Sequence, residues 1–466
     1  MTFEFGVAAG DVTETTAVLW TRTNPSTTVD WQLLGDSSGP PRHGTTTSTT
    51  GGFVHVELTE LKPGTSWRYQ FSVDGTASAW GRFRTIPKTG VIRFAVVSCA
   101  KYNSGYFNAY EAIANRSDLD FVLHLGDYIY EAGQFPRGNQ SPGIDIGRPF
   151  EPLHDCVTLD DYERRYAQYR QDPQLQKLHA AHGMIFTLDD HEIADNAWSG
   201  GAEEHFPEDG PWSERLSHAL TAWQHWQPTL RTPADGGNLW QTVQLGDIAS
   251  LFLCDTRLNR SDPFAPDTHD KTILGAEQVA ALEHESRSGA EPWLIVGMAS
   301  KFLGLEEARG NAAADFVFQT LKLSDQHGNP HHDRWDACSN ERQRLLATLE
   351  ASPRRTLMLC GDVHFAAHSQ TASGAVIECL TSSITSPNFD DKAGWTHGTA
   401  SRPYEQKLVE LIPELTWCDL DRHGYAIVEI TRDTMSCEWW GVATVAESSL
   451  DEELLHRVEV GVDQRP

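Results

Sequence analysis

The sequence predicts an α/β protein with a smaller all-β domain at its amino-terminal end. Two patterns and the length indicate this division. Over residues 1–88, short runs of strand-forming residues alternate with turn signals. After the segment Thr85–Gly90, short apolar runs alternate with helix-like stretches. A chain of 466 residues is also too long for one hydrophobic core. We therefore expect one domain over residues 1–88 and a second over residues 89–466.

The first domain is expected to be a small β-sandwich of the fibronectin or immunoglobulin kind. Its strand candidates are Thr16–Arg22, Thr28–Leu34, Phe53–Leu58 and Trp67–Val73. The tract Gly44–Gly52 between two of them has the composition of a flexible loop. We expect this domain to pack against the larger one as a cover, so it receives no catalytic residue.

The larger domain is predicted from short buried strands that alternate with amphipathic helices. The strand candidates are Ile92–Ser98, Phe121–Leu125, Met184–Leu188, Ser250–Leu253, Pro292–Met298 and Leu357–Leu359. The helix candidates are Tyr106–Asn115, Asp161–Arg170, Ser213–Trp226, Ala276–Ser286 and Asn340–Glu350. Near the carboxyl terminus, we expect Tyr425–Val445 to form a β-hairpin. The segment after Glu447 is expected to be a polar tail.

The composition limits the partners of the protein. A formal net charge of -28 argues against nucleic acid, because phosphate backbones are bound by stripes of Lys and Arg. No apolar run has the length of a transmembrane helix. The first residues, MTFEFGVAAGD, have neither a basic nor an apolar signal region. We therefore expect a cytoplasmic protein, or a secreted one if a targeting peptide has been removed.

Several predicted strands are followed by residues of the types that bind metal ions. These residues are Cys99, Asp127 with Tyr130, Asp190 with His191, and Asp362 with His364. In an open α/β sheet, ligands gather at the carboxyl ends of the strands. Residues that are far apart in the sequence are therefore expected to converge on one site.

The candidate ligands fall into two chemical sets. The thiol of Cys99, the phenol of Tyr130 and the imidazole of His364, with one carboxylate, suit a transition metal such as iron. The oxygen ligands Asp127, Asp190 and Asp362 suit a hard cation such as Ca²⁺, Mg²⁺ or Mn²⁺. Two metals roughly 3.5–4 Å apart can clamp a phosphoryl group and activate a water for in-line attack. We assign Asp127 the role of a carboxylate that bridges them.

Each motif taken alone also has a structural interpretation. Cys99 would then be a buried thiol, Asp127 a helix cap, and the run HGNPHH at His327–His332 an exposed loop. A non-haem iron redox enzyme is a second hypothesis, since Cys, Tyr and His also hold redox iron, although a clear two-His facial triad is absent. A third is a surface-binding module, which only the β-domain suggests. The joint occurrence of the motifs after separate strands favours the metal-dependent hydrolase.

The motifs resemble those of the PhoD-like alkaline phosphatase family, within the calcineurin-like metallophosphoesterase superfamily. The segments that carry the resemblance follow the family's order to about residue 445: FGVAAGD, AVLWTR, VVSCAKYNSGYFNAY, VLHLGDYIYE, DYERRYAQYRQDPQLQ, LDDHEIADNAW, LCDTRLNR, RWDACSNERQRLL, CGDVHFAAHS and SSITSPN. The resemblance implies a fibronectin-like domain followed by a four-layer αββα sandwich. It also implies a phosphomonoesterase, with a phosphodiesterase of the phospholipase D type as the alternative. The substrate would be a small phosphate ester.

The resemblance also implies roles for single residues. The ligands of a ferric ion would be Cys99, Asp127, Tyr130 and His364, and those of a neighbouring divalent site, Ca²⁺ in some relatives, would be Asp127, Asp190 and Asp362. His191 would stabilise the phosphoryl oxygens or protonate the leaving oxygen. Asn196, Arg257 and Lys301 are candidate contacts to metal or phosphate. The chain departs from the family where it has Asp195-Asn196 instead of a paired Asn-Asn, and Asp190 instead of Asn.

Overall fold

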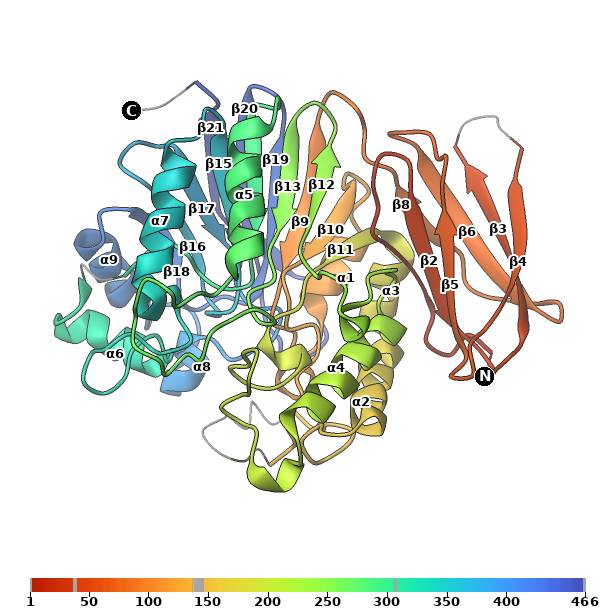
Figure 1. The fold of residues 1–466 in the computed structure, drawn as a ribbon, viewed down its shortest axis with the longest axis horizontal. Helices are drawn as coiled ribbons and strands as arrows, with labels where there is room; N and C mark the ends of the chain where they lie inside the picture. The colour runs from red at the N-terminus through yellow and green to blue at the C-terminus, as the bar shows by residue number, and fades with distance from the viewer. Residues whose placement is uncertain (1, 37–39, 136, 138–145, 306–307, 464–466) are drawn as a thin grey trace.

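Two β-sheets lie face to face at the centre of the molecule, and helices cover their outer sides (Figure 1). The computed structural model describes residues 2–36, 40–135, 137, 146–305 and 308–463. Within these residues, every helix is too short or too polar to span a lipid bilayer.

The first sheet has nine strands and contains three of the strands that precede the candidate ligands. In spatial order the strands are β21 (Glu452–Gly461), β20 (Thr434–Val442), β19 (Gly424–Ile430), β9 (Ile92–Val97), β10 (Phe121–His124), β11 (Gly183–Phe186), β1 (Val7–Gly10), β2 (Ala17–Arg22) and β5 (Phe53–Leu58). The neighbours β9, β10, β11 and β1 run parallel. Their carboxyl ends therefore lie at one edge of the sheet.

The second sheet has seven strands and contains the fourth ligand-bearing strand, β15. Its spatial order is β12 (Gln241–Leu245), β13 (Ala249–Leu253), β14 (Trp293–Gly297), β15 (Arg355–Cys360), β17 (Val376–Leu380), β16 (Ala366–Gln370) and β18 (Leu415–Asp419). Strands β13, β14, β15 and β17 run parallel and are buried throughout. Such continuous apolar runs are typical of strands that are covered on both faces.

Three hydrophobic layers hold the sheets and helices together. Apolar side chains of both sheets form the central layer, where Phe94 and Leu123 of the first sheet belong to the same core as Leu357 of the second. Helices α1 (Asn108–Ala114), α2 (Leu159–Gln171), α3 (Pro173–Ala181) and α4 (Trp212–Trp226) cover the outer face of the first sheet. Helices α5 (Ala276–Ser288), α6 (Ala312–Thr320), α7 (Ser339–Glu350), α8 (Phe389–Ala393) and α9 (Arg402–Leu411) contribute to the core on the other side. The predicted four-layer αββα sandwich is thus confirmed.

The amino-terminal part is an antiparallel all-β domain, as the sequence predicts. A five-stranded sheet contains β4 (Arg42–Thr47), β3 (Thr28–Gly35), β6 (Ser66–Val73) and β7 (Thr76–Ala77), with β8 (Gly81–Arg84) paired to β6. This sheet packs on β1, β2 and β5 through a separate apolar core. Because β1 also pairs with β11, the amino-terminal strands continue the large sheet instead of forming an isolated unit.

The carboxyl-terminal tail differs from the prediction. The hairpin is confirmed by β19 and β20, but the segment expected as a polar tail contains the ten-residue strand β21. This strand pairs with β20 at the edge of the large sheet, and most of its side chains are partly or fully exposed. One face of this edge strand packs on the central core through Val458 and Val460, and the charged residues Arg457 and Glu459 alternate with them. The charged residues give the segment the composition of a tail.

Candidate metal centre

The candidate ligands lie just beyond the carboxyl ends of β9, β10, β11 and β15. Cys99 follows β9, Asp127 follows β10, Asp190 follows β11, and Asp362 with His364 follows β15. The backbone joins the first two of these ends, because the amide of Ala100 donates to the carbonyl of Asp127 at 2.9 Å. The seven-stranded sheet also reaches this site, because ligand atoms of His364, which follows β15, and of Cys99, which follows β9, lie within 4.8 Å of each other.

Asp127 lies at the centre of two groups of possible ligand atoms. Cys99, Asp127 and His364 each offer one atom, and these atoms lie within 4.8 Å of one another. Asp127, Asp190 and His191 form a second group by the same measure. One carboxylate is therefore shared by two groups, the arrangement expected of a residue that bridges two metal ions.

Tyr130 and Asp362 complete this cluster. The hydroxyl of Tyr130 donates to Oδ2 of Asp127 at 2.9 Å and lies 3.4 Å from Nε2 of His364. The carboxylate of Asp362 accepts a hydrogen bond from Ser300 at 3.0 Å and forms an ion pair with Arg334. Nδ1 of His364 faces the carbonyl of Pro387 at 3.0 Å, a contact that directs its other nitrogen toward the cluster.

The backbone at the cluster is strained. Residues other than glycine rarely adopt positive φ, and each such residue costs about 1–3 kcal/mol unless its surroundings enforce it. The candidate site residues with positive φ are Cys99 (61°), Asp127 (54°), Asn196 (55°), Asp362 (71°) and His364 (64°). Strain of this kind clusters at functional sites, and the expected ligands show it together.

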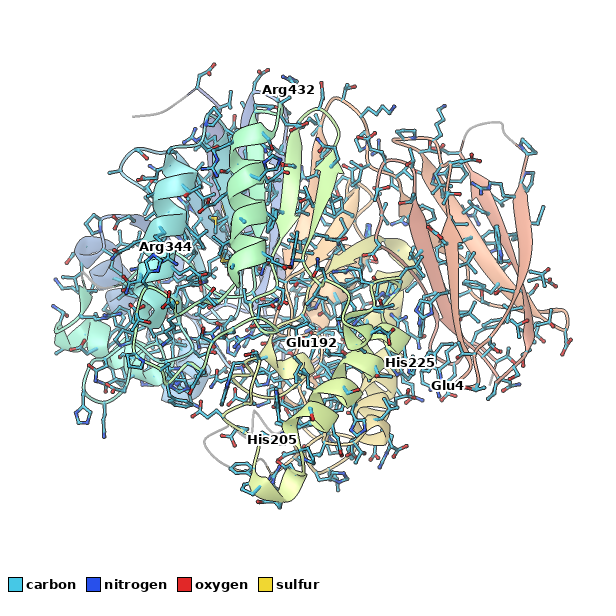
Figure 2. All side chains as sticks on the ribbon, in the orientation of Figure 1. Glu4, Glu192, His205, His225, Arg344 and Arg432 are labelled. Atoms are coloured by element: carbon cyan, nitrogen blue, oxygen red, sulfur yellow. The ribbon has the colours of Figure 1, made fainter. Side chains whose placement is uncertain are left out.

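Glu192 holds the ends of β10 and β11 together. It is buried near the centre of the molecule (Figure 2), where its carboxylate accepts hydrogen bonds from the amides of Asp127 at 2.9 Å, Tyr128 at 2.5 Å and Asp189 at 2.8 Å. Sequence reasoning did not identify this role, because its partners are backbone amides, which no residue type reveals.

His191 is held in a defined orientation beside the cluster. Its Nδ1 lies 2.7 Å from Oε2 of Glu131, and its ring centroid lies 4.0 Å from that of Tyr130. Its Nε2 is 3.6 Å from Oδ1 of Asp195. Burial lowers the pKa of His191, but the nearby carboxylates of Glu131, Asp190 and Asp127 outweigh burial and raise it well above its ordinary value. The surrounding carboxylates therefore favour the protonated form of this imidazole.

Burial and mutual repulsion disfavour ionised acids in this cluster. Burial, together with repulsion by Asp190 and Asp362, raises the pKa of Asp127 to about 7 despite the attraction of His191. Burial also raises the pKa values of the Cys99 thiol and the Tyr130 phenol and lowers that of His364. Several acidic groups are thus costly to ionise where they lie, and metal ions would offset that cost. The thiol, phenol, imidazole and carboxylate donors fit a transition metal next to a harder cation.

These residues line a cavity of about 100 Å³. Asp127, Tyr130, Asp190, His191, Asp362 and His364 are among its lining residues. Cations that the sequence did not single out also line it: Lys101, Lys322, Arg334 and Lys392. Lys101 lies two residues after Cys99, and Arg334 directly precedes Trp335, so both lie in segments that carry the family resemblance. Only the fold brings all four cations to one cavity.

The three residues expected to contact metal or phosphate are placed differently from one another. Asn196 lines the cavity, and its backbone N–H donates a hydrogen bond to Oδ2 of Asp190 at 2.7 Å. Arg257 is buried, with Nη1 2.6 Å from Asp333 and Nη2 3.3 Å from Asp190. Lys301 is buried and lies 2.9 Å from Glu378. Neither Arg257 nor Lys301 is a lining residue of the cavity, so the structure does not bring them to the position expected of phosphate contacts.

Two further groups of metal-binding residue types lie nearby. Glu203, His331 and His332 offer atoms within 4.8 Å of one another, and Glu203 accepts a hydrogen bond from the Asn196 side chain at 2.6 Å. The run HGNPHH, expected to be an exposed loop, thus brings His331 to the cavity wall. The second group is Asp390, His397 and Asp421, next to α8.

Comparison with known proteins identifies the family of the chain. Residues 94–439 match the family model described as PhoD-like phosphatase, and residues 1–87 match the model of its N-terminal domain. Alkaline phosphatase D of Bacillus subtilis (strain 168) is 29% identical over 401 residues, which cover 78% of this chain and 64% of that protein. A solved structure of PhoD has a TM-score of 0.84 at 25% identity, covering 99% of this chain and 91% of that one. The chain belongs to the PhoD-like phosphatase family.

Proposed function

We propose that this protein hydrolyses small phosphate esters at a binuclear centre of Fe³⁺ and a divalent cation, Ca²⁺ or alternatively Mn²⁺ or Mg²⁺. The observation that carries the proposal is that the Asp127 carboxylate lies within 4.8 Å of the ligand atoms of Cys99 and His364 and also of a carboxylate oxygen of Asp190. A shared carboxylate at the ends of parallel strands is what a two-metal phosphoesterase requires.

The proposed iron ligands are Cys99, Asp127, Tyr130 and His364, and those of the divalent cation are Asp127, Asp190 and Asp362. Metal ions held there would neutralise charge on the phosphoryl oxygens and orient a water for in-line attack. The chain itself fixes the ligand positions through Glu192 and through the carbonyl contact of His364.

His191 is the proposed general acid. Glu131 holds Nδ1 at 2.7 Å, which leaves Nε2 on the side that faces Asp195 in the cavity wall. A protonated imidazole there can hydrogen-bond a phosphoryl oxygen or give its proton to the leaving oxygen. Asn196 is proposed to support this wall by its hydrogen bonds to Asp190 and Glu203.

We propose a phosphomonoester as the substrate, because the family model that matches residues 94–439 is described as PhoD-like phosphatase. A phosphodiesterase remains the alternative, and a single paired assay separates the two.

The test measures phosphate release from p-nitrophenyl phosphate and p-nitrophenol release from bis(p-nitrophenyl) phosphate. It compares the wild type with Asp127→Ala and with the control Asp160→Ala, whose side chain is 80% exposed on α2. We expect the monoester to be preferred, Asp127→Ala to lose at least about a thousandfold in kcat, and the control to match the wild type. Turnover by Asp127→Ala equal to that of the wild type would refute the proposal.

Elemental analysis of the same proteins gives an independent measurement. We expect iron in the wild type and a loss of metal in Asp127→Ala. A Tyr130 phenolate or Cys99 thiolate bound to Fe³⁺ should also give a coloured charge-transfer band. Stoichiometric zinc as the only metal would contradict the proposal. Oxygen consumption without phosphate release would also contradict it and would favour the iron redox hypothesis.

A further inference from the structure

Two histidines and one glutamate meet at the edge of the cavity, outside the groups that contain Asp127. Glu203, His331 and His332 each offer one ligand atom, and these atoms lie within 4.8 Å of one another. None of the three belongs to either group of ligand atoms around Asp127. Because His331 also lines the cavity, this group borders the proposed centre without being part of it.

Backbone contacts hold the two segments that carry these side chains. The amide of His331 donates to the carbonyl of Leu323 at 3.0 Å, and the amide of Arg334 donates to the carbonyl of His331 at 2.9 Å. On the other side, the amide of Glu203 donates to the carbonyl of Asp195 at 3.1 Å. The main chain therefore presents all three side chains from fixed positions, which a metal site requires.

The side chains themselves are also oriented. The ring centroid of His332 lies 4.2 Å from that of His331 and 4.2 Å from that of Phe264. Its Nε2 lies 3.2 Å from Oε2 of Glu203, and the same oxygen accepts a hydrogen bond from the side chain of Asn196 at 2.6 Å. A hydrogen bond of this kind orients a carboxylate that binds a metal ion.

The chemistry of the group indicates which ion it suits. Two imidazole nitrogens and one carboxylate form a set that proteins use for zinc, with a fourth position left for water or substrate. Ca²⁺ takes about six to eight oxygen ligands, a set that these three residues do not supply. An ion pair between Glu203 and His332 would explain their contact, but it needs only two of the three members.

We propose that Glu203, His331 and His332 bind a Zn²⁺ ion at the edge of the cavity, in addition to the metal ions of the centre at Asp127. An ion bound beside His331 would add positive charge to the cavity wall. Binding must displace the contact between Glu203 and His332, so we expect a Kd in the micromolar range. Zinc at this site therefore exchanges with the buffer and is lost from dilute, zinc-free protein.

The experiment titrates ZnCl₂ into full-length Asp127→Ala by calorimetry, after a chelator has been applied and removed. This parent lacks the residue that the two groups at the centre share. We expect it to bind one Zn²⁺ per chain. We expect Glu203→Gln or His332→Gln, added to this parent, to weaken zinc binding about tenfold or more. The melting temperature of each variant without zinc checks that it is folded.

Two matched controls replace histidines outside the group. His327 is an exposed residue of the same run, and His397 belongs to the group next to α8. We expect His327→Gln and His397→Asn, each added to the same parent, to bind zinc as the parent does. Zinc binding that is lost in His397→Asn and kept in His332→Gln would overturn the inference, and so would the absence of any zinc binding.

Diffraction from zinc-soaked crystals of the wild type locates the ion directly. We expect an anomalous peak about 2.0–2.1 Å from one ring nitrogen of His331 and one of His332. Anomalous peaks at other positions, with none beside these two rings, would overturn the inference. Both measurements report binding and not turnover, so their failure leaves the proposed hydrolysis intact, and failure of the phosphatase assay leaves this site intact.

Discussion

At the scale of single residues, Gly126 makes the approach of β10 to β11 possible. It has a φ of 104°, and a Cβ atom on it would lie 2.5 Å from the amide nitrogen of Asp189. We expect Gly126→Ala to destabilise the protein by about 2 kcal/mol or more and to lower its metal content, because the strand ends must separate. Urea unfolding measures the change in stability, and elemental analysis measures the change in metal content.

Gly90 is the matched control for this substitution. It also has a φ of 104°, but a Cβ atom there would meet nothing within 4 Å. Gly90→Ala therefore reports the backbone strain alone, and the difference between the two variants reports the clash. Equal stability of the two variants would show that the close approach at Gly126 is unimportant.

The role of His191 predicts a dependence on the leaving group. We expect His191→Ala to lower kcat about 10²–10⁴-fold on an alkyl phosphate, whose leaving oxygen needs a proton. The loss should be smaller on p-nitrophenyl phosphate, because nitrophenolate leaves without one. Rates for a series of aryl and alkyl phosphates measure this difference. An equal loss on all of them would assign His191 to the phosphoryl oxygens instead of the leaving oxygen.

Sequence reasoning named the candidate ligands but not the side chains that support them. Cys99, Asp127 and His364 follow short apolar strands, and that position is visible in the chain. Glu131 and Glu192 act through an imidazole and through backbone amides, which sequence patterns do not reveal. Lys322 and Lys392 line the cavity from segments whose placement depends on long-range packing, so their position could not be foreseen.

At the scale of elements, most strands of the two sheets could be predicted, but their pairing could not. The parallel pairing of β1 with β11 joins the first ten residues of the chain to a strand about 170 residues away. Apolar runs indicate that a strand is buried, but they do not indicate which strand lies beside it. The edge strand β21 was missed for another reason, because charged residues alternate with the few apolar side chains, such as Val458 and Val460, that pack on the central core.

The β1–β11 pairing predicts that removal of residues 1–88 damages the larger domain. Deletion leaves β11 with an unpaired edge and uncovers the apolar surface of the larger domain that Ala8, Trp20 and Phe53 cover. We expect aggregation or a clear loss of stability, measured by solubility and urea unfolding. Deletion of β21, already at the sheet edge, should be milder. This expectation would be contradicted if a fragment of residues 89–466 were as stable as the full chain.

The turn after α8 predicts a pH-dependent contribution to stability. His397 lies between Asp391 and Asp421, with Nε2 3.1 Å from the first and Nδ1 2.5 Å from the second. Hydrogen bonds to Asp391 and then to Asp421 raise the pKa of His397 from 6.5 to about 10. Burial opposes ionisation of Asp391, but His397 and His423 outweigh it and hold its pKa below 3.8.

These directions set the sign of the effect. A raised histidine pKa stabilises the fold fully below pH 6.5 and loses its contribution as the pH rises toward 10. A lowered carboxyl pKa contributes above pH 3.8. Between pH 3.8 and pH 6.5, we expect His397→Asn to reduce the free energy of unfolding by about 1 kcal/mol, a modest effect because the ring is half exposed. Above pH 10 we expect the substitution to have no effect on the free energy of unfolding. Urea titrations against His269→Asn, an exposed control, test this window.

At the scale of the whole molecule, the proposed centre joins the two sheets. Cys99, Asp127 and Asp190 extend from the nine-stranded sheet, whereas Asp362 and His364 extend from the seven-stranded one. A metal ion bound by both sets would act as a cross-link between the two halves of the sandwich. Because the unfolded chain cannot present these ligands together, bound metal stabilises the folded state by mass action.

Removal of metal should therefore lower the melting temperature as well as the activity. Ligand at about a thousand times its Kd contributes about 4 kcal/mol, so we expect a chelator to lower the Tm by several degrees. Asp127→Ala should melt near the chelated wild type and respond little to the chelator, because it has lost the shared ligand. Asp160→Ala should behave as the wild type. If chelation lowered the Tm of Asp127→Ala as much as that of the wild type, the stabilising ion would lie elsewhere, and the groups at Glu203 or Asp390 would be its candidate sites.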